Sequence, residues 1–221
     1  MTTLHTLTPG TLVVGSYAAF APLCWQDGDT ARGRDIDFLQ LFATQLNLQL
    51  VVHFFEFDRL WERPGRSEVD IAAASIAPLA SRAAPGVVWS DPYFTVQRSL
   101  LIRATDRQQL KTIADFATQT IGVTLGSTAD LDTAARKPAT TQVVYYDNQK
   151  RAVHALLRGR IDGFGTGDVC SHYLVDRYPG QLAVADVHSM ATPENFAFAV
   201  RQASSLLEPL NAFIREHRES Y

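Results

Sequence analysis

The stretch DIAAASIAPLASR, residues 70–82, is a run of small and apolar residues between Asp70 and Pro78, and it ends in Arg82. A short uninterrupted apolar run bounded by a turn residue is typical of a strand buried on both faces, as in the parallel sheets of α/β proteins. Arg82 after such a strand has two interpretations. It is a cation that holds a ligand, or a solvated arginine on a helix surface, and the rest of the chain must decide between them.

Strands and helices alternate on both sides of this stretch. The β-rich segments are residues 11–17, 48–55, 69–75, 87–94, 97–104, 119–126, 141–146, 160–168 and 196–201. The segments with helical spacing or capping residues are 36–46, 57–62, 112–117, 127–137, 148–159 and 204–220. This alternation predicts the α/β class with largely parallel sheets.

Length and composition exclude several classes of protein. The 221 residues are enough for one large domain or two small lobes, and 46% of them are hydrophobic. The net charge of −3 and the lack of a basic tract argue against a nucleic-acid partner. The longest uncharged stretch, residues 12–25, is too short to span a bilayer. The opening MTTLHTLTPG has no basic or apolar signal segment, so we expect no signal peptide within this chain.

No pattern in the sequence indicates a metal or a cofactor. The cysteines, Cys24 and Cys170, form no CxxC pair, and the six histidines are scattered without metal-ligand spacing. The glycine-containing segments GSTAD and GFGTGD do not match the phosphate-binding motifs. We therefore predict no metal site, no cofactor and no catalytic residues.

An ordered set of motifs is similar to the bacterial type II periplasmic solute-binding proteins. The resemblance is to extracellular solute-binding protein family 3, whose members bind polar amino acids for ABC importers. The motifs are GTLVVGSYAAFAP (10–22), GRDIDFLQLFATQL (33–46), FDRLWE (57–62), VDIAAAS (69–75), WSDPYF (89–94), IGVTLGST (121–128) and ALLRGRIDGFGTGD (155–168). Their order and spacing carry the resemblance, which covers residues 10 to 215 or so.

The resemblance implies a two-lobe α/β fold whose lobes are joined by two crossing strands, with the ligand in the cleft between them. It places lobe 1 at residues 1–96 plus 192–221 and lobe 2 at residues 97–191. Cys24 then lies in lobe 1 and Cys170 in lobe 2. A disulfide between them would prevent the lobes from moving, so we expect two free thiols.

The resemblance also assigns ligand contacts for a carboxylate. In the family an arginine follows the strand aspartate by twelve residues, and Asp70 and Arg82 keep that spacing. The planar guanidinium suits a carboxylate because it donates to both oxygens. Ser127 and Thr128 begin a helix whose first N–H groups suit an anion. The alternative for these two residues is a plain helix cap.

Further contacts carry alternatives of their own. Ser75 matches a family contact position, or it is a buried strand serine bonded to backbone. Phe57 and Phe20 match aromatic residues that cover the ligand, or they are core residues. Tyr17 and Ala77 are also expected ligand contacts by position, and both depart from the family. Tyr17 stands where basic-amino-acid binders have an aspartate, and Ala77 stands where a serine or threonine is usual.

The expected partner for a ligand ammonium is the weakest element of the predicted site. Family members have an aspartate at the position of Gly167, whereas this chain has Asp168 one residue later. Asp168 either binds the ammonium or caps the helix that follows. We expect the ligand to be an amino acid if Asp168 binds the ammonium. If Asp168 does not, we expect a related small carboxylate without that group, because an unpaired buried ammonium is costly.

These observations predict a solute-binding protein that captures such a ligand for ABC-type import. We expect a monomer in the periplasm or outside the cell, with a membrane ABC permease as its partner and no enzymatic activity. Two alternatives share the fold. One is the ligand-sensing domain of a receptor. The other is an enzyme similar to cyclohexadienyl dehydratase, although the glutamate of those enzymes is absent near Cys170.

Overall fold

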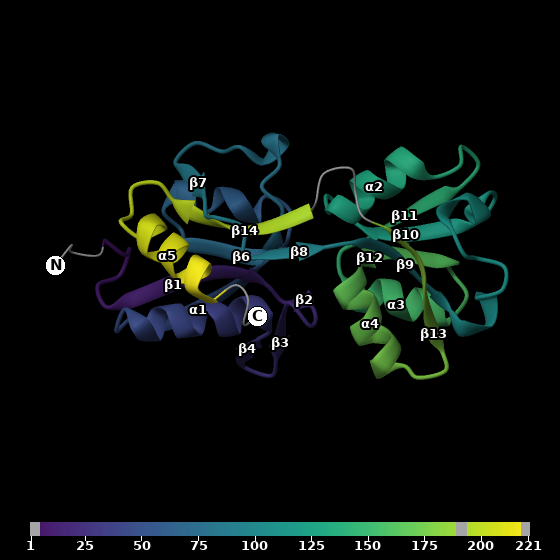
Figure 1. Cartoon of the computed structure of the whole chain (residues 1–221), viewed down its shortest axis with the longest axis horizontal. Helices are drawn as coiled ribbons and strands as arrows, with labels where there is room; N and C mark the ends of the chain where they lie inside the picture. Colours follow the sequence, from purple (N-terminus) through teal and green to yellow (C-terminus); the bar gives the residue numbers. More distant parts are fainter. Residues whose placement is uncertain (1–4, 189–193, 218–221) are drawn as a thin grey trace. The chain divides into compact units, whose positions relative to one another are not determined.

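The computed structural model describes residues 5–188 and 194–217 and divides into two compact units. Unit 1 consists of Met1–Thr95 and Asn195–Tyr221, and unit 2 of Val96–Glu194. Figure 1 shows a sheet covered by helices in each unit. The chain therefore passes from one unit to the other twice.

Unit 1 is built on a sheet with the strand order β5-β1-β6-β14-β7, and β8 pairs with β14. Its strands are β1 (Thr11–Tyr17), β5 (Gln49–Phe55), β6 (Ile71–Ile76), β7 (Val87–Trp89), β8 (Phe94–Val96) and β14 (Glu194–Arg201). The three neighbours β5, β1 and β6 run parallel, whereas β14 is antiparallel to β6 and β7. Strands β8 and β14 contain the two points where the chain changes unit.

Helices α1 (Arg34–Gln45) and α5 (Leu207–His217) pack against each other in unit 1. The ring of Phe213 lies 5.0 Å from that of Phe38 and 5.5 Å from that of Phe42. Phe38 also stacks on Phe198 of the sheet at 5.8 Å. Phe38 and Phe42 lie four residues apart on α1 and therefore share the face that the helix buries.

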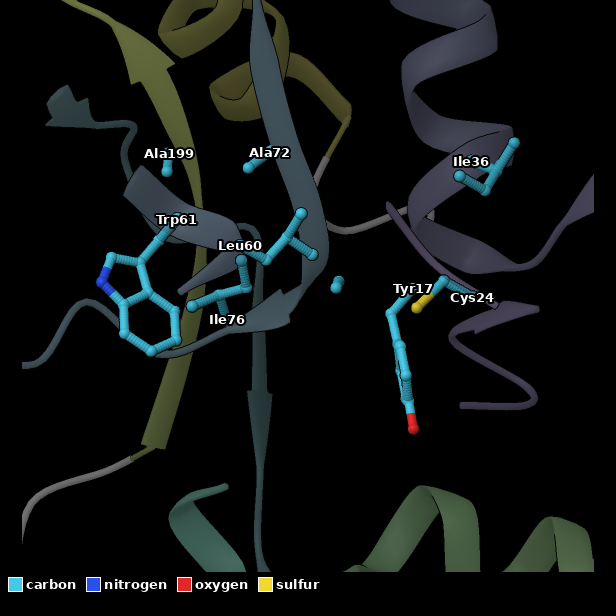
Figure 2. Packing of buried hydrophobic residues seen from close by; sticks show 9 residues of the cluster. Tyr17, Cys24, Ile36, Leu60, Trp61, Ala72, Ile76 and Ala199 are labelled. Atoms are coloured by element: carbon cyan, nitrogen blue, oxygen red, sulfur yellow. The ribbon is translucent and has the colours of Figure 1, made fainter. Parts of the chain in front are cut away.

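Short elements complete unit 1. Its 3₁₀ turns are η1 (Leu60–Glu62), η2 (Pro64–Arg66) and η3 (Ala80–Arg82), and a small antiparallel ribbon consists of β2 (Ala19–Phe20), β3 (Cys24–Asp27) and β4 (Thr30–Arg32). Figure 2 shows the apolar cluster beside them, in which Tyr17, Cys24, Leu60, Trp61 and Ile76 are buried. The aromatic residues of the predicted site, Tyr17, Phe20 and Phe57, therefore belong to this packed apolar cluster or lie against it.

Unit 2 has the strand order β11-β10-β12-β9-β13. Its strands are β9 (Arg98–Arg103), β10 (Thr120–Thr124), β11 (Gln142–Tyr146), β12 (Gly163–Gly167) and β13 (Leu182–His188). Strands β11, β10 and β12 run parallel, and β9 is antiparallel to both β12 and β13. This half-parallel arrangement resembles that of unit 1.

Helices cover both faces of this sheet. Helix α2 (Thr128–Arg136) lies on one face and helices α3 (Gln149–Leu157) and α4 (Asp168–Arg177) on the other, as Figure 1 shows. The 3₁₀ turns η4 (Ala104–Asp106) and η5 (Ile113–Phe116) precede β10, and η5 begins with a capping box between Thr112 and Asp115. Two clusters of buried apolar residues form the core of unit 2, one including Phe164 and the other Phe116.

Several expectations from the sequence need correction. The sheets are mixed rather than largely parallel, because β7, β9, β13 and β14 run back against their neighbours. The helix expected at 57–62 is only one 3₁₀ turn, preceded by Arg59 with φ of 57°. The strand expected at 160–168 is shorter, because β12 ends at Gly167 and α4 begins at Asp168. The lobe limit expected at 191 and 192 and the last residues of the final helix lie outside the described residues.

Three simple observations bear on the class of protein. Cys24 and Cys170 are both buried, and neither forms a disulfide. Among the described residues, no cluster of three or more His, Cys, Asp or Glu is arranged to hold a metal ion. In the same part of the chain, every helix is too short or too polar to cross a membrane.

Candidate functional site

The predicted contacts of unit 1 gather where its parallel strands end. Strands β5, β1 and β6 are neighbours and end at Phe55, Tyr17 and Ile76, with Tyr17 in register with Phe55. Because parallel strands present their carboxyl ends at one edge of the sheet, the segments that follow them lie together. This edge holds Tyr17, Phe57, Ser75 and the segment that leads to Arg82.

Arg82 is a buried cation, not a solvated one. Its exposed fraction is 3%, and its Nη1 donates to the carbonyl oxygen of Ala77 at 3.0 Å. The guanidinium carbon lies 4.8 Å from the ring centre of Trp61 and 5.6 Å from that of Phe57. Aromatic faces attract a cation at these distances, most strongly away from water. The structure therefore removes the surface-helix interpretation of Arg82.

Asp70 has a structural role at the opposite end of β6. Its buried carboxylate accepts hydrogen bonds from the backbone N–H groups of Leu7 at 2.9 Å and Val13 at 3.1 Å. Arg201 lies 3.4 Å from the same carboxylate. Asp70 thus lies just before the buried strand β6, and Arg82 lies at the end of the turn that follows it.

The aromatic residues form a connected group in unit 1. The ring of Phe57 lies edge-on to Tyr17 at 5.9 Å and to Trp61 at 6.3 Å. Phe20, on β2, packs against the same apolar cluster and is partly buried, as is Phe57. Tyr17 is fully enclosed, with 5% exposure. This burial makes Tyr17 a residue of the core, whereas Phe57 and Phe20 retain surface for a ligand.

Ser75 belongs to a buried polar network that the sequence analysis did not predict. Asp35, in the first turn of α1, accepts from the backbone N–H of Ser75 at 2.5 Å and from its hydroxyl at 3.0 Å. The hydroxyl of Tyr93 donates to the other carboxylate oxygen at 2.6 Å. Ser75 therefore bonds to a side chain, not to the backbone partner considered from the sequence.

Burial controls the protonation of this network. Desolvation raises the pKa of Asp35 from 3.8 to about 6, and the hydrogen bonds from Tyr93 and Ser75 oppose that rise. Burial, and then the charge of Asp35, raise the pKa of Tyr93 well above its ordinary value of 10. At neutral pH the carboxylate is thus ionised and the phenol keeps its proton.

A sequence signal for Asp35 exists. It lies three residues before Phe38 and seven before Phe42, so it falls on the apolar stripe of α1. A charged residue on a buried helix face needs partners, and this position could have been singled out for that reason. Tyr93 has no comparable signal, because it follows Pro92 in an irregular segment.

The predicted contacts of unit 2 lie at the edge where β10 and β12 end. Ser127 caps α2, and its hydroxyl oxygen accepts from the N–H of Asp130 at 3.2 Å. The hydroxyl of Thr128 donates to Glu194, which pairs with Arg98 at 2.7 Å. Thr128, Glu194 and Arg98 are all buried, so the Thr128 hydroxyl already has a partner within the protein.

Asp168 begins α4 at the same sheet edge, because β12 is the parallel neighbour of β10. Its carboxylate accepts from the backbone N–H groups of Val169 at 2.9 Å and Gln97 at 3.1 Å. These bonds support the interpretation of Asp168 as a residue that holds backbone in place. Its role in binding an ammonium stays a prediction.

The fold and these strand-end residues define a class, the two-lobe solute-binding proteins of the type II periplasmic-binding fold. Residues 12–221 match the sequence model of a protein family, the bacterial extracellular solute-binding proteins, family 3. The chain belongs to that family. The resemblance noted from the motifs is thereby confirmed.

Several members and structures of this kind are similar to the chain. The amino-acid-binding protein AabA of Dichelobacter nodosus is 24% identical over 89% of this chain and 78% of its own length. The arginine-binding extracellular protein ArtP of Bacillus subtilis is 24% identical over 52% of this chain, and the match spans only 44% of ArtP. An ancestral arginine-binding protein, solved with arginine bound, has a TM-score of 0.84 and 27% identity, covering 95% of this chain and 93% of its own.

Proposed function

We propose that this protein binds an amino acid, whose carboxylate is received by Arg82. The observation that carries the proposal is the environment of Arg82, a buried guanidinium that lies against Trp61 and Phe57 at the strand-end edge of unit 1. A planar guanidinium shielded from water binds a carboxylate strongly through paired N–H donors. Arginine is bound by one relative and by the similar solved structure, so it is the first ligand to test.

Other residues complete the proposed site. Phe57 and Phe20 supply apolar surface for the ligand side chain. The family resemblance adds Ser127 and Thr128 as contacts at the start of α2. The function is capture without chemical change, for delivery to a membrane ABC permease from the periplasm or the cell exterior. Family membership supports this proposal, and the named relatives are binding proteins.

A thermal-shift panel of amino acids and simple carboxylates tests the proposal. A ligand at about 100 times its Kd stabilises the native state by about 2.7 kcal/mol. For a chain of this size, that corresponds to a rise in Tm of roughly 5–10 °C. We expect L-arginine to give such a rise, and mass spectrometry to recover the ligand unchanged.

Variants of Arg82 make the test specific. Arg82→Lys keeps the charge but loses the planar pair of donors, so the affinity should fall by at least about tenfold. Arg32→Ala is the control, because Arg32 is an exposed arginine of the same unit that pairs with Asp27. Ligand binding that is unchanged in Arg82→Lys and Arg82→Ala would contradict the assignment.

A further inference from the structure

A basic segment of unit 2 has no role in the proposed amino-acid site. Residues 148–161 include Lys150, Arg151, Arg158 and Arg160, together with His154, and contain no acidic residue. They form helix α3 and the turn that follows it. The whole chain has a net charge of −3, so this concentration of positive charge is local. Charge of one sign that is concentrated on part of a surface attracts ions of the opposite sign.

Most of these cations line one hollow beside α3. The hollow has a volume of about 320 Å³ and is lined by Tyr146, Arg151, His154, Ala155, Arg158 and Arg160. The four residues on α3 and at its end are spaced three or four positions apart, so they share one face of the helix. Tyr146, the last residue of β11, adds an aromatic wall. The short side chain of Ala155 leaves the space between Arg151 and Arg158 open.

The acids on either side of the basic segment are already paired. Asp147 pairs with Arg151 at 2.8 Å, and Asp162 pairs with Arg103 at 3.0 Å. Within the residues that the structure describes, the two other arginines of the hollow form no ion pair with an acid. The hollow therefore keeps a positive charge that the protein itself does not neutralise.

The end of helix α3 does not account for these two arginines. A cation near a helix C-terminus is stabilised by the last carbonyl groups. Arg103 already performs this role, because its Nη1 donates to the carbonyl oxygens of Leu156 at 3.1 Å and of Ile161 at 2.6 Å. Arg158 and Arg160 are exposed and lie near Arg151, and cations placed this close repel one another. An anion in the hollow would replace this repulsion with attraction.

We propose that this hollow binds a phosphate group. A phosphate has several charged oxygens and can accept from more than one guanidinium group at once, whereas a single guanidinium is enough to match a carboxylate. The volume suits a small ligand or a headgroup. The phosphate belongs either to a free anion or to a phospholipid. All of the lining residues lie in unit 2, so the proposal does not rest on the amino-acid site at Arg82.

Calorimetry with inorganic phosphate and with pyrophosphate tests the first source. Arg158→Gln and Arg160→Gln each remove one cation from the hollow, so the Kd should rise by at least about fivefold, as for loss of a charged hydrogen bond. Arg177→Gln is the matched control, because Arg177 is an exposed arginine in the last turn of α4 and does not line the hollow. It should leave the Kd unchanged. Wild-type binding should weaken as NaCl rises from about 0.02 to about 0.3 M.

Vesicle sedimentation tests the second source. Vesicles that contain phosphatidylglycerol carry a net negative charge, whereas vesicles of phosphatidylcholine alone carry none. If the phosphate belongs to a lipid, the first kind should retain the wild-type chain and the second should not. Arg158→Gln and Arg160→Gln should reduce the retained fraction, and Arg177→Gln should behave as the wild type does.

The outcomes separate a built site from general attraction between charges. All three variants should unfold at the wild-type Tm, because each replaces an exposed side chain. A loss of binding in the two hollow variants but not in Arg177→Gln supports the inference. Binding in neither experiment overturns it, and so does an equal loss in all three variants. Either of these failures leaves the proposed function standing, since Arg82 lies in unit 1.

Discussion

Replacing Asp35 with asparagine should change the pH dependence of stability by a predictable amount. Burial raises the pKa of Asp35 from 3.8 to about 6. As the pH falls, the folded protein therefore binds this proton at a higher pH than the unfolded chain does. The difference of about two pKa units, at about 1.4 kcal/mol each, amounts to about 3 kcal/mol. This stability is fully present below pH 3.8 and is lost as the pH rises through 6.

The assay is urea unfolding followed by tryptophan fluorescence between pH 4 and pH 7. All three tryptophans, Trp25, Trp61 and Trp89, lie in unit 1 with Asp35, so the signal reports on the unit that carries the change. Between these pH values the wild-type free energy of unfolding should fall by about 2.4 kcal/mol more than that of Asp35→Asn, because pH 4 lies just above the unfolded pKa and part of the full effect appears only at lower pH. Subtracting the variant removes the contribution of the other groups that titrate in this range.

Asp37→Asn is the control, because it removes an exposed acid from the same first turn of α1. Its difference from the wild type should change little across the range. A wild-type minus Asp35→Asn difference that stays flat from pH 4 to pH 7 would refute the reasoning. It would mean that the carboxyl is solvated or fully compensated by its partners.

Two further substitutions test the parts around the site. Thr128→Val removes the hydroxyl that donates to the buried Glu194, so it should destabilise unit 2 by about 1–3 kcal/mol in thermal unfolding. Thr105→Val is the control, because it removes an exposed hydroxyl and should leave the stability unchanged. Equal stability of the two variants would contradict this prediction. Gly33→Ala places a Cβ 2.4 Å from the Leu23 carbonyl oxygen at a φ of 116°, and in urea unfolding it should cost about 1–3 kcal/mol more than Gly28→Ala. Gly28 has a φ of 59° and a Cβ there meets nothing within 4 Å, so equal losses would contradict the predicted clash with Leu23.

The sequence was sufficient where a pattern repeats or a spacing is characteristic. The small-residue strand before Arg82 is strand β6, and the segment GST at 126–128 is the start of α2. Apolar runs and capping residues act locally, so a single sequence contains the information for them. The order of these elements was enough to identify the family.

The elements that were missed depend on contacts across the chain. The ribbon β2–β4 has strands of only two to four residues, too short for a period to appear. The network at Ser75 joins residues 40 and 58 positions from Asp35, and no local pattern connects them. Buried polar groups must find partners, but the sequence does not say which partners the fold supplies.

Each unit contains one buried thiol, and its alkylation rate can report on the stability of that unit. Cys24 belongs to unit 1 and Cys170 to unit 2, and both side chains are fully enclosed. An alkylating reagent reaches an enclosed thiol only when the surrounding structure opens, so each labelling rate measures the opening of one unit. Peptide mapping separates the two rates in a single unmodified chain. A ligand that binds to unit 1 should slow the labelling of Cys24.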